Sequence, residues 1–235
     1  MNTHFYNIKH ALLQLFFPNV CCGCGIDALT AGSKLCVKCI YELPATGFEK
    51  YYNNLIEKIL AGRVPVENAT AQFYFVKESK LQHIMHQFKY RGDKELGKQL
   101  GVIMGTRLLE SNRFNHIDML IPVPLHISKK RKRGYNQAQV LCKGIADALL
   151  LPVAEDIVTR PAVTETQTRK NRTDRWQNME GKFLLVDAEA IKGKHILLVD
   201  DVITTGATIE ACANALIAAP DVKISIATLC YASNI

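Results

Sequence analysis

The run from His195 to Thr208, HILLVDDVITTGAT, constrains the fold of this chain more than any other segment. Its apolar, branched part, Ile196 to Val199, predicts a central strand buried in a parallel sheet. Two carboxylates, Asp200 and Asp201, come at the carboxyl end of that strand, which is where open α/β sheets bind ligands. The run therefore predicts an α/β protein with a ligand site beside this strand.

The residues that follow the two carboxylates favour a phosphate ligand. Thr204, Thr205 and Gly206 offer hydroxyl groups and a backbone without side-chain bulk, and a helix is expected to begin near Ala207 or Thr208. The first turn of a helix presents unpaired amide N–H groups and the positive end of its dipole. Because carboxylates suit sugar hydroxyls, the whole segment indicates a sugar-phosphate site. The alternative is that the two aspartates cap a helix or belong to a metal site of another kind.

The rest of the chain alternates between strand and helix patterns. A connector over residues 40–65, with a short helix at 54–60, separates a cysteine-rich N-terminal part from this region. We therefore expect residues 1–62 to hold an N-terminal helix, the cysteine module and a linker, and residues 63–235 to form one α/β domain. Its sheet should be mainly parallel, with helices on both faces. The expected strands and helices are 71–76, 81–88, 94–109, 118–124, 136–151, 183–186 and 222–229.

Five of the eight cysteines fall within nineteen positions. Cys21-x-x-Cys24 and Cys36-x-x-Cys39 form two knuckles, and four thiolates so spaced suit a closed, structural Zn²⁺ site with Zn–S distances of about 2.3 Å. Disulfides and plain reduced thiols are the alternatives, and a chain without a secretion signal disfavours disulfides. Cys22 is a spare thiol inside the first knuckle.

Composition sets outer limits on the class of protein. The net charge of +7 indicates an anionic partner such as a nucleotide or nucleic acid. The chain has no apolar run of the ~18 residues that a membrane span needs. An amphipathic helix is expected at 5–17, and cysteines rather than a cleavage site follow it, so we expect a cytoplasmic protein. The absence of a Gly-x-x-x-x-Gly-Lys-Ser/Thr sequence excludes a P-loop ATPase.

Residues 199–208 resemble the phosphoribosyl pyrophosphate (PRPP) motif of type I phosphoribosyltransferases. The resemblance implies that Asp200 and Asp201 engage the ribose 2′- and 3′-hydroxyls together with Mg²⁺. It also implies a loop around the 5′-phosphate, formed by Thr204, Thr205, Gly206 and Thr208.

Further segments are similar to the competence protein F family, over a stretch that runs from Cys21 to Leu229. That family joins a Cys₄ zinc module to a phosphoribosyltransferase-like domain, and its members are linked to DNA uptake in natural transformation. The chain departs from the family pattern at Cys22 and Lys170. The matching segments are Lys89-Tyr90-Arg91-Gly92-Asp93, Pro122-Val123-Pro124-Leu125-His126, Arg133-Gly134-Tyr135-Asn136-Gln137, and the spaced set Gln167, Arg175, Asn178 and Phe183.

Two of these segments carry expected roles. Lys89, Tyr90 and Arg91 follow a helix and face the pyrophosphate, unless they are an ordinary basic helix end. The segment Arg133-Gly134-Tyr135-Asn136-Gln137 forms a flexible loop over the site, with Arg133 as a catalytic charge, unless it is a helix start without a ligand.

Other polar and thiol groups receive simpler interpretations. The run Lys129–Arg133 is a solvated basic face, a phosphate-attracting segment or a contact for single-stranded DNA. His83 and His86 lack metal-ligand partners and are expected to pack. Core packing is also expected for Cys142, Cys212 and Cys230.

Three functions compete at this point. The first is an Mg²⁺-dependent phosphoribosyltransferase that uses PRPP, and the second is a PRPP or nucleotide sensor without catalysis. The third is an adaptor that handles single-stranded DNA or docks DNA-uptake or recombination proteins. The sequence identifies neither the acceptor substrate nor the oligomeric state.

Overall fold

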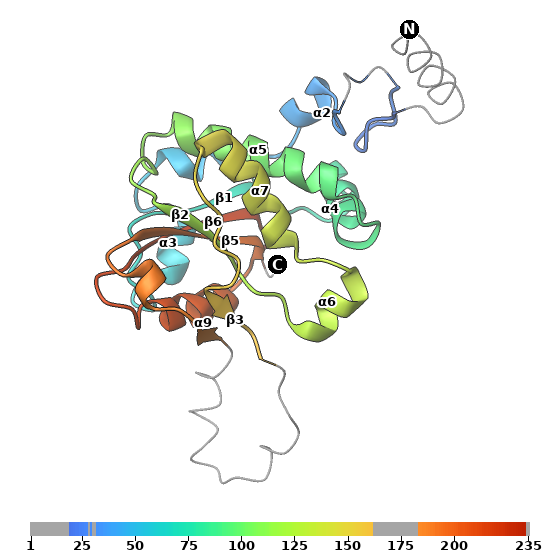
Figure 1. The fold of residues 1–235 in the computed structure, drawn as a ribbon. Coiled ribbons are helices and arrows are strands. Elements are labelled where there is room, and N and C mark those ends of the chain that lie inside the picture. The colour runs from blue at the N-terminus through green and yellow to red at the C-terminus, as the bar shows by residue number, and fades with distance from the viewer. Residues whose placement is uncertain (1–18, 28, 30–31, 162–182, 234–235) are drawn as a thin grey trace, which may run out of the picture.

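The computed structural model describes residues 19–27, 29, 32–161 and 183–233. Four strands form a parallel sheet in the order β1-β6-β5-β2, and β3 and β4 form a separate antiparallel pair (Figure 1). The strands are β1 (Ala69–Tyr74), β2 (Met119–Pro122), β3 (Val158–Thr159), β4 (Leu184–Leu185), β5 (His195–Ile203) and β6 (Lys223–Tyr231).

Strand β5 lies inside the sheet, between β6 and β2, as its apolar sequence predicts. Ile196 to Val199 are completely buried. The strand then continues through both aspartates to Ile203, whereas β2 stops at Pro122, opposite Val199. The two carboxylates therefore belong to the strand rather than following it, and they extend past the end of β2.

Helices cover both faces of the sheet, which confirms the predicted fold class (Figure 1). One core cluster packs α4, α5 and α7 against the sheet, and the other packs α3 and α9 against the opposite face. Cys142, Cys212 and Cys230 are buried in these clusters, as predicted. The covering helices are α3 (Leu55–Leu60), α4 (Lys80–Tyr90), α5 (Lys94–Glu110), α7 (Gln137–Leu149) and α9 (Ala207–Leu216).

Polar side chains mark where several helices begin. Ser79 accepts a hydrogen bond from the Gln82 amide at the start of α4, and Asn136 accepts one from the Ala138 amide at the start of α7. Asn54 and Asp93 cap α3 and α5 in the same way. The helices predicted from the sequence pattern begin and end within two residues of the observed boundaries.

Some local structure differs from the sequence-based expectation. The basic run is a helix, α6 (Ile127–Arg133), and a short helix α2 (Val37–Tyr41) lies in the cysteine module. His83 and His86 are exposed rather than packed, so that expectation was wrong. The described residues also form two single-turn 3₁₀ helices, η1 (Phe48–Lys50) and η3 (Glu189–Ile191).

The segment that joins the cysteine module to the sheet packs closely against the sheet. Ala45 pairs with Phe73 of β1, and Ile56 and Leu60 of α3 are completely buried. The division of the chain after residue 62 stays a prediction. The helix expected at 5–17 and the positions Gln167, Lys170, Arg175 and Asn178 lie outside the described residues.

Helices α5 and α7 approach each other closely enough for their backbones to touch. A Cβ atom on Gly101 would lie 2.3 Å from the Leu141 carbonyl oxygen, and one on Gly144 would lie 2.1 Å from the Lys98 carbonyl oxygen. Glycine at these two positions therefore fixes α7 against α5. This contact also fixes the start of α7, where Asn136 and Gln137 reach the site described below.

Candidate functional site

A cavity of about 190 Å³ opens where β5 extends past β2. Four cationic side chains and two carboxylates face it, so the cavity carries excess positive charge. Its lining consists of Lys89, Val123, Pro124, Leu125, Lys129, Arg133, Asn136, Gln137, Ala138, Arg160, Asp200, Asp201, Val202 and Thr208.

One of the two carboxylates of β5, that of Asp201, pairs with cations from other elements. Asp201 Oδ2 lies 2.9 Å from Lys89 Nζ, at the end of α4, and 3.9 Å from Arg133 Nη1, at the end of α6. The Asp201 amide donates a hydrogen bond of 2.8 Å to Asp200 Oδ1. Asp201 is therefore paired with two cations. Among the described residues, neither Lys89 nor Arg133 forms such a pair with Asp200.

This difference appears in the pKa of Asp200, which is raised from 3.8 to about 8. Burial is the largest cause, and the neighbouring negative charge of Asp201 adds to it. Lys89 and Arg160 act in the opposite direction without cancelling the effect. A cation placed against Asp200 would relieve the same repulsion.

The segment after β5 has the features expected of a phosphate loop. Thr204 and Thr205 are exposed, and Gly206 precedes α9 with a φ of 80° that favours glycine. The first turn of α9 contains Thr208, which lines the cavity. Amide N–H groups in such a turn have no acceptor within their own helix and suit an anion.

The three residues predicted to face a pyrophosphate lie in different places. Lys89 reaches the cavity and pairs with Asp201. Tyr90 is exposed beside it, with the Arg133 guanidinium 5.7 Å from its ring centroid. Arg91 caps the end of α4, is exposed, and is absent from the cavity lining.

The Arg133–Gln137 segment is the turn between α6 and α7. Arg133 Nη1 donates a hydrogen bond of 2.9 Å to Gln137 Oε1, and both residues line the cavity. Gly134 has a φ of 79°, which lets the chain reverse between the helices. Tyr135 is buried, and its hydroxyl donates to the Phe88 carbonyl of α4. The flexibility predicted for this segment stays a prediction.

Sequence reasoning missed one cavity residue, Arg160, and gave Lys129 no specific place in the site. Arg160 follows β3, and its guanidinium lies 5.1 Å from the centroid of the Phe183 ring. Strand β3 is two residues long, too short to produce a strand pattern, so no signal in the sequence marked Arg160. Lys129 lies on α6, which places one residue of the basic run at the cavity.

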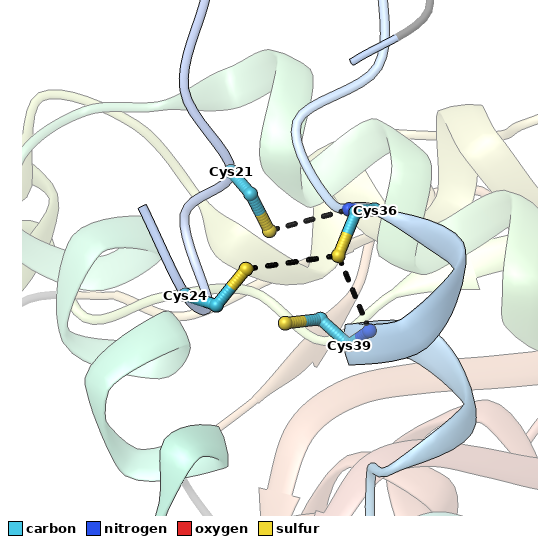
Figure 2. Close-up of side chains that lie close together, drawn as sticks. All are labelled: Cys21, Cys24, Cys36 and Cys39. Carbon is cyan, nitrogen blue, oxygen red and sulfur yellow. Dashed lines mark hydrogen bonds between the residues drawn. The ribbon is translucent and has the colours of Figure 1, made fainter. Parts of the chain in front are cut away.

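The second candidate site is the cysteine cluster (Figure 2). The sulfur atoms of Cys21, Cys24, Cys36 and Cys39 all lie within 4.8 Å of one another, and those of Cys24 and Cys36 are 3.7 Å apart. A tetrahedral Zn²⁺ with four sulfur ligands has S–S separations of about 3.8 Å. The four predicted ligands therefore converge on a site that could hold a metal.

Hydrogen bonds to the Cys21 sulfur favour the thiolate form of Cys21, the form in which a cysteine binds a metal. Burial of Cys21 opposes ionisation, but amide N–H groups of Cys36 and Gly23 donate to its sulfur at 3.2 and 3.4 Å. The pKa of Cys21 is lowered to about 6 as a result. Cys22 points elsewhere, and its thiol donates to Asp93 Oδ2 over 3.9 Å.

The cysteine module contacts the helix that carries Lys89. Gln87 of α4 donates a hydrogen bond of 2.9 Å to the Cys22 carbonyl, and Lys34 lies 3.6 Å from Asp93, the residue that caps α5. Gln99 Oε1 of α5 accepts from the Lys34 amide at 2.8 Å. Because Gln87 and Lys89 share a helix, the module supports one wall of the cavity.

Comparison with known proteins matches part of this chain to a described family. Residues 123–234 match the family model of the phosphoribosyl transferase domain, and this segment contains β5, the loop that follows it and α9. Among solved structures, a glutamine PRPP amidotransferase from B. subtilis has a TM-score of 0.42 and 19% sequence identity, covering 60% of this chain and 30% of its own. Residues 123–234 are therefore similar to a phosphoribosyl transferase domain.

Curated relatives match a larger share of the chain than the family model does. The DNA utilization protein YhgH of Shigella flexneri is 29% identical over 153 residues, which are 64% of this chain and 66% of that protein. Competence protein F of Haemophilus influenzae is 31% identical over 134 residues, 55% of this chain and 58% of that protein. Competence protein ComFC of Bacillus subtilis is 27% identical over 137 residues, 58% of this chain and 53% of that protein.

These relatives confirm the resemblance to the competence protein F family. The matched segments span less than two thirds of each relative's length. Among the described residues, none of the helices has both the length and the apolar character of a membrane span.

The cysteine cluster makes a direct prediction about metal content. Cys36→Ser should lower bound zinc to well below one equivalent and destabilise the module, because it removes one of four converging ligands. Cys22→Ser should keep the zinc, because the Cys22 sulfur faces Asp93 instead. Elemental analysis and thermal unfolding of the purified variants measure both effects. A folded Cys36→Ser protein with full zinc content would contradict the assignment.

The raised pKa of Asp200 makes a prediction about stability in the metal-free protein. The folded pKa of about 8 exceeds the ordinary value of 3.8, so the folded state binds the proton more tightly. The contribution of Asp200 to stability is therefore present at low pH and is lost as pH rises toward about 8. Asp200→Asn should remove this loss.

Urea unfolding at several pH values tests this prediction. Relative to wild type, Asp200→Asn should gain stability as pH rises, while Asp187→Asn, at an exposed position, serves as the control. A pH-independent difference between Asp200→Asn and wild type would show that Asp200 ionises normally.

Proposed function

We propose that this protein binds PRPP with Mg²⁺ at the β5 cavity and transfers the phosphoribosyl group to an acceptor that is still to be identified. The observation that carries the proposal is a combination of three features at one cavity: two adjacent carboxylates, the first turn of α9 with its backbone amides, and four cationic side chains in the lining. These three features match the three chemical parts of PRPP: ribose hydroxyls, 5′-phosphate and pyrophosphate.

The two carboxylates suit Mg²⁺ as well as ribose. Mg²⁺ prefers oxygen ligands and is commonly bound through one or two carboxylates together with substrate phosphates. The burial of Asp200 beside Asp201 leaves negative charge that a cation would stabilise. Bound there, Mg²⁺ would help to neutralise the pyrophosphate leaving group.

Each part of the cavity then has a distinct task. Asp200 and Asp201 accept hydrogen bonds from the ribose 2′- and 3′-hydroxyls. The amides and hydroxyls of the loop hold the 5′-phosphate. The proposed 5′-phosphate residues are Thr204, Thr205, Gly206 and Thr208.

The cations of the cavity would act on the leaving group. Breaking the bond between ribose C1′ and pyrophosphate gives the ribose oxocarbenium character and the pyrophosphate more negative charge. Lys89 and Arg133 already lie near Asp201, and Arg160 lines the same cavity. Fixed positive charges at these positions stabilise the departing pyrophosphate without having to reorganise. Tyr90 and Arg91, at the end of α4, are proposed to approach the same group.

We also propose a structural role for Zn²⁺ in the cysteine module. Four cysteine ligands leave no open coordination position, so the metal would hold the module together rather than take part in the reaction. The names of the relatives place them in DNA utilization and competence. We propose that this chain acts in the cytoplasm in the same setting, with DNA-uptake or recombination proteins as partners.

A second candidate function is contact with single-stranded DNA through α6. Lys129, Lys130, Arg131 and Lys132 are all exposed, and none pairs with an acidic side chain among the described residues. A row of unpaired cations attracts a phosphate backbone. The same charges also suit a sensor that binds PRPP without catalysis.

The α6 candidate predicts a salt-dependent affinity for single-stranded DNA. Replacing Lys130, Arg131 and Lys132 with Gln should weaken binding about tenfold or more at low salt, because fewer counterions are released. The matched control replaces Lys58, Lys77 and Lys192, exposed lysines on other elements. Fluorescence anisotropy measures the change, and equal binding by all three proteins would eliminate α6 as the contact.

The PRPP proposal predicts binding that depends on both aspartates. Calorimetry with Mg²⁺ and PRPP should show affinity that falls about 100-fold or more in Asp200→Asn/Asp201→Asn, because two charged contacts are lost. The control is Asp147→Asn/Asp187→Asn, at two exposed positions outside the cavity. Unchanged affinity in the Asp200/Asp201 variant, with the fold and zinc content intact, would refute the site.

A further inference from the structure

Arg63 occupies the space between the end of α3 and the start of α9, behind the phosphate loop. Its Nη1 atom donates a hydrogen bond of 2.5 Å to the Thr205 carbonyl and one of 3.2 Å to the Ile59 carbonyl. Its Nε atom donates to Glu210 Oε2 at 3.0 Å, and Nη2 donates to the same oxygen. One side chain thus ties α3, the loop and the first turn of α9 together.

The bond to the Thr205 carbonyl fixes the direction of the next amide. In a trans peptide the C=O and N–H groups are held in one plane and point in opposite directions. Because the Thr205 oxygen faces Arg63, the Gly206 N–H points away from Arg63. Arg63 therefore sets the orientation of a loop amide without occupying the ligand side of the loop.

The pairing with Glu210 makes a cation tolerable at this position. The first turn of a helix is positively polarised, so an unpaired guanidinium there would be repelled. Glu210 lies in the first turn of α9 and forms an ion pair with Arg63, and both side chains are about one-third exposed. The pair therefore stays in place while the amides of the turn remain available.

Side chains of α3 limit the loop further. A Cβ atom on Gly206 would lie 3.1 Å from Ile59 Cγ2, 3.2 Å from Leu60 Cδ2 and 3.3 Å from Arg63 Nη1. Gly206 also has a φ of 80°, so both its backbone conformation and its close neighbours favour glycine at this position. The loop is thus packed against residues 59–63, which come from the connector that precedes the sheet.

We infer that Arg63 is a positioning residue for the phosphomonoester end of the substrate, acting through the Thr205 carbonyl. This inference rests on the proposed PRPP function and adds a residue that the motif itself does not contain. Arg63 is absent from the cavity lining, which contains the carboxylates and the pyrophosphate-facing cations. Its removal should therefore weaken binding of a 5′-phosphate without weakening binding of pyrophosphate.

The test measures the two ends of PRPP separately on the full-length, zinc-loaded protein. Calorimetry with ribose 5-phosphate and, in a second titration, with Mg²⁺-pyrophosphate gives an affinity for each. Arg63→Gln should weaken binding of ribose 5-phosphate about tenfold and leave binding of pyrophosphate unchanged, because the charged hydrogen bond to the Thr205 carbonyl is lost. Arg63→Lys, which keeps one charged donor, should recover part of the loss.

Arg113→Gln provides the matched control for a structural effect. Arg113 also contacts α3, through a hydrogen bond of 2.6 Å from its Nη2 atom to Glu57 Oε1. Its Nη1 atom donates to the Phe48 carbonyl, so these contacts lie on α3 and η1 rather than on the phosphate loop. This variant should lose stability and keep the ratio of the two affinities. Should Arg63→Gln fail to fold, Glu210→Gln keeps the arginine, loosens it, and is expected to shift the same ratio.

The possible outcomes separate the inference from the proposed function. A folded Arg63→Gln protein with wild-type affinity for ribose 5-phosphate, or with equal losses for both ligands, would overturn the role of Arg63 alone. A wild-type protein that binds neither ligand would overturn the PRPP function and this inference together. A selective loss of ribose 5-phosphate affinity supports both.

Discussion

Two adjacent carboxylates at the end of a buried strand are the constraint on which the rest of the site depends. Burial disfavours the charge of Asp200 and the neighbouring charge of Asp201 adds to this effect, so positive charge nearby stabilises the pair. The cations come from segments far apart in the sequence: Lys89 ends α4, Arg133 ends α6 and Arg160 follows β3. The cavity therefore exists only when these elements are in place.

Contacts on both faces of the sheet hold those elements. On one face, the cysteine module bonds to α4 through Gln87, and the buried Tyr135 bonds to Phe88, one residue before Lys89. On the other face, Arg63 joins α3 to the phosphate loop. Consequently the N-terminal segments, which lie outside the domain match at residues 123–234, contact both the helix that carries Lys89 and the loop before α9.

The sequence predicted the parts of this protein that are encoded locally. Ile196–Val199 is a continuous apolar run, the helices have apolar residues at helical spacing, and the four cysteines converge as their spacing indicates. Arg160 and Arg63 could not be predicted from the sequence, because their positions depend on a two-residue strand and on a long-range contact with Thr205. It also misplaced His83 and His86, since an apolar helix face does not show which neighbouring polar residues reach solvent.

A crystal structure of the protein with Mg²⁺ and PRPP would test the central claim most directly. The account predicts ribose hydroxyls on Asp200 and Asp201, the 5′-phosphate on the first turn of α9 after Gly206, and the pyrophosphate beside Lys89 and Arg133. PRPP bound elsewhere on the protein, or bound at this cavity with its 5′-phosphate away from the α9 turn, would contradict it.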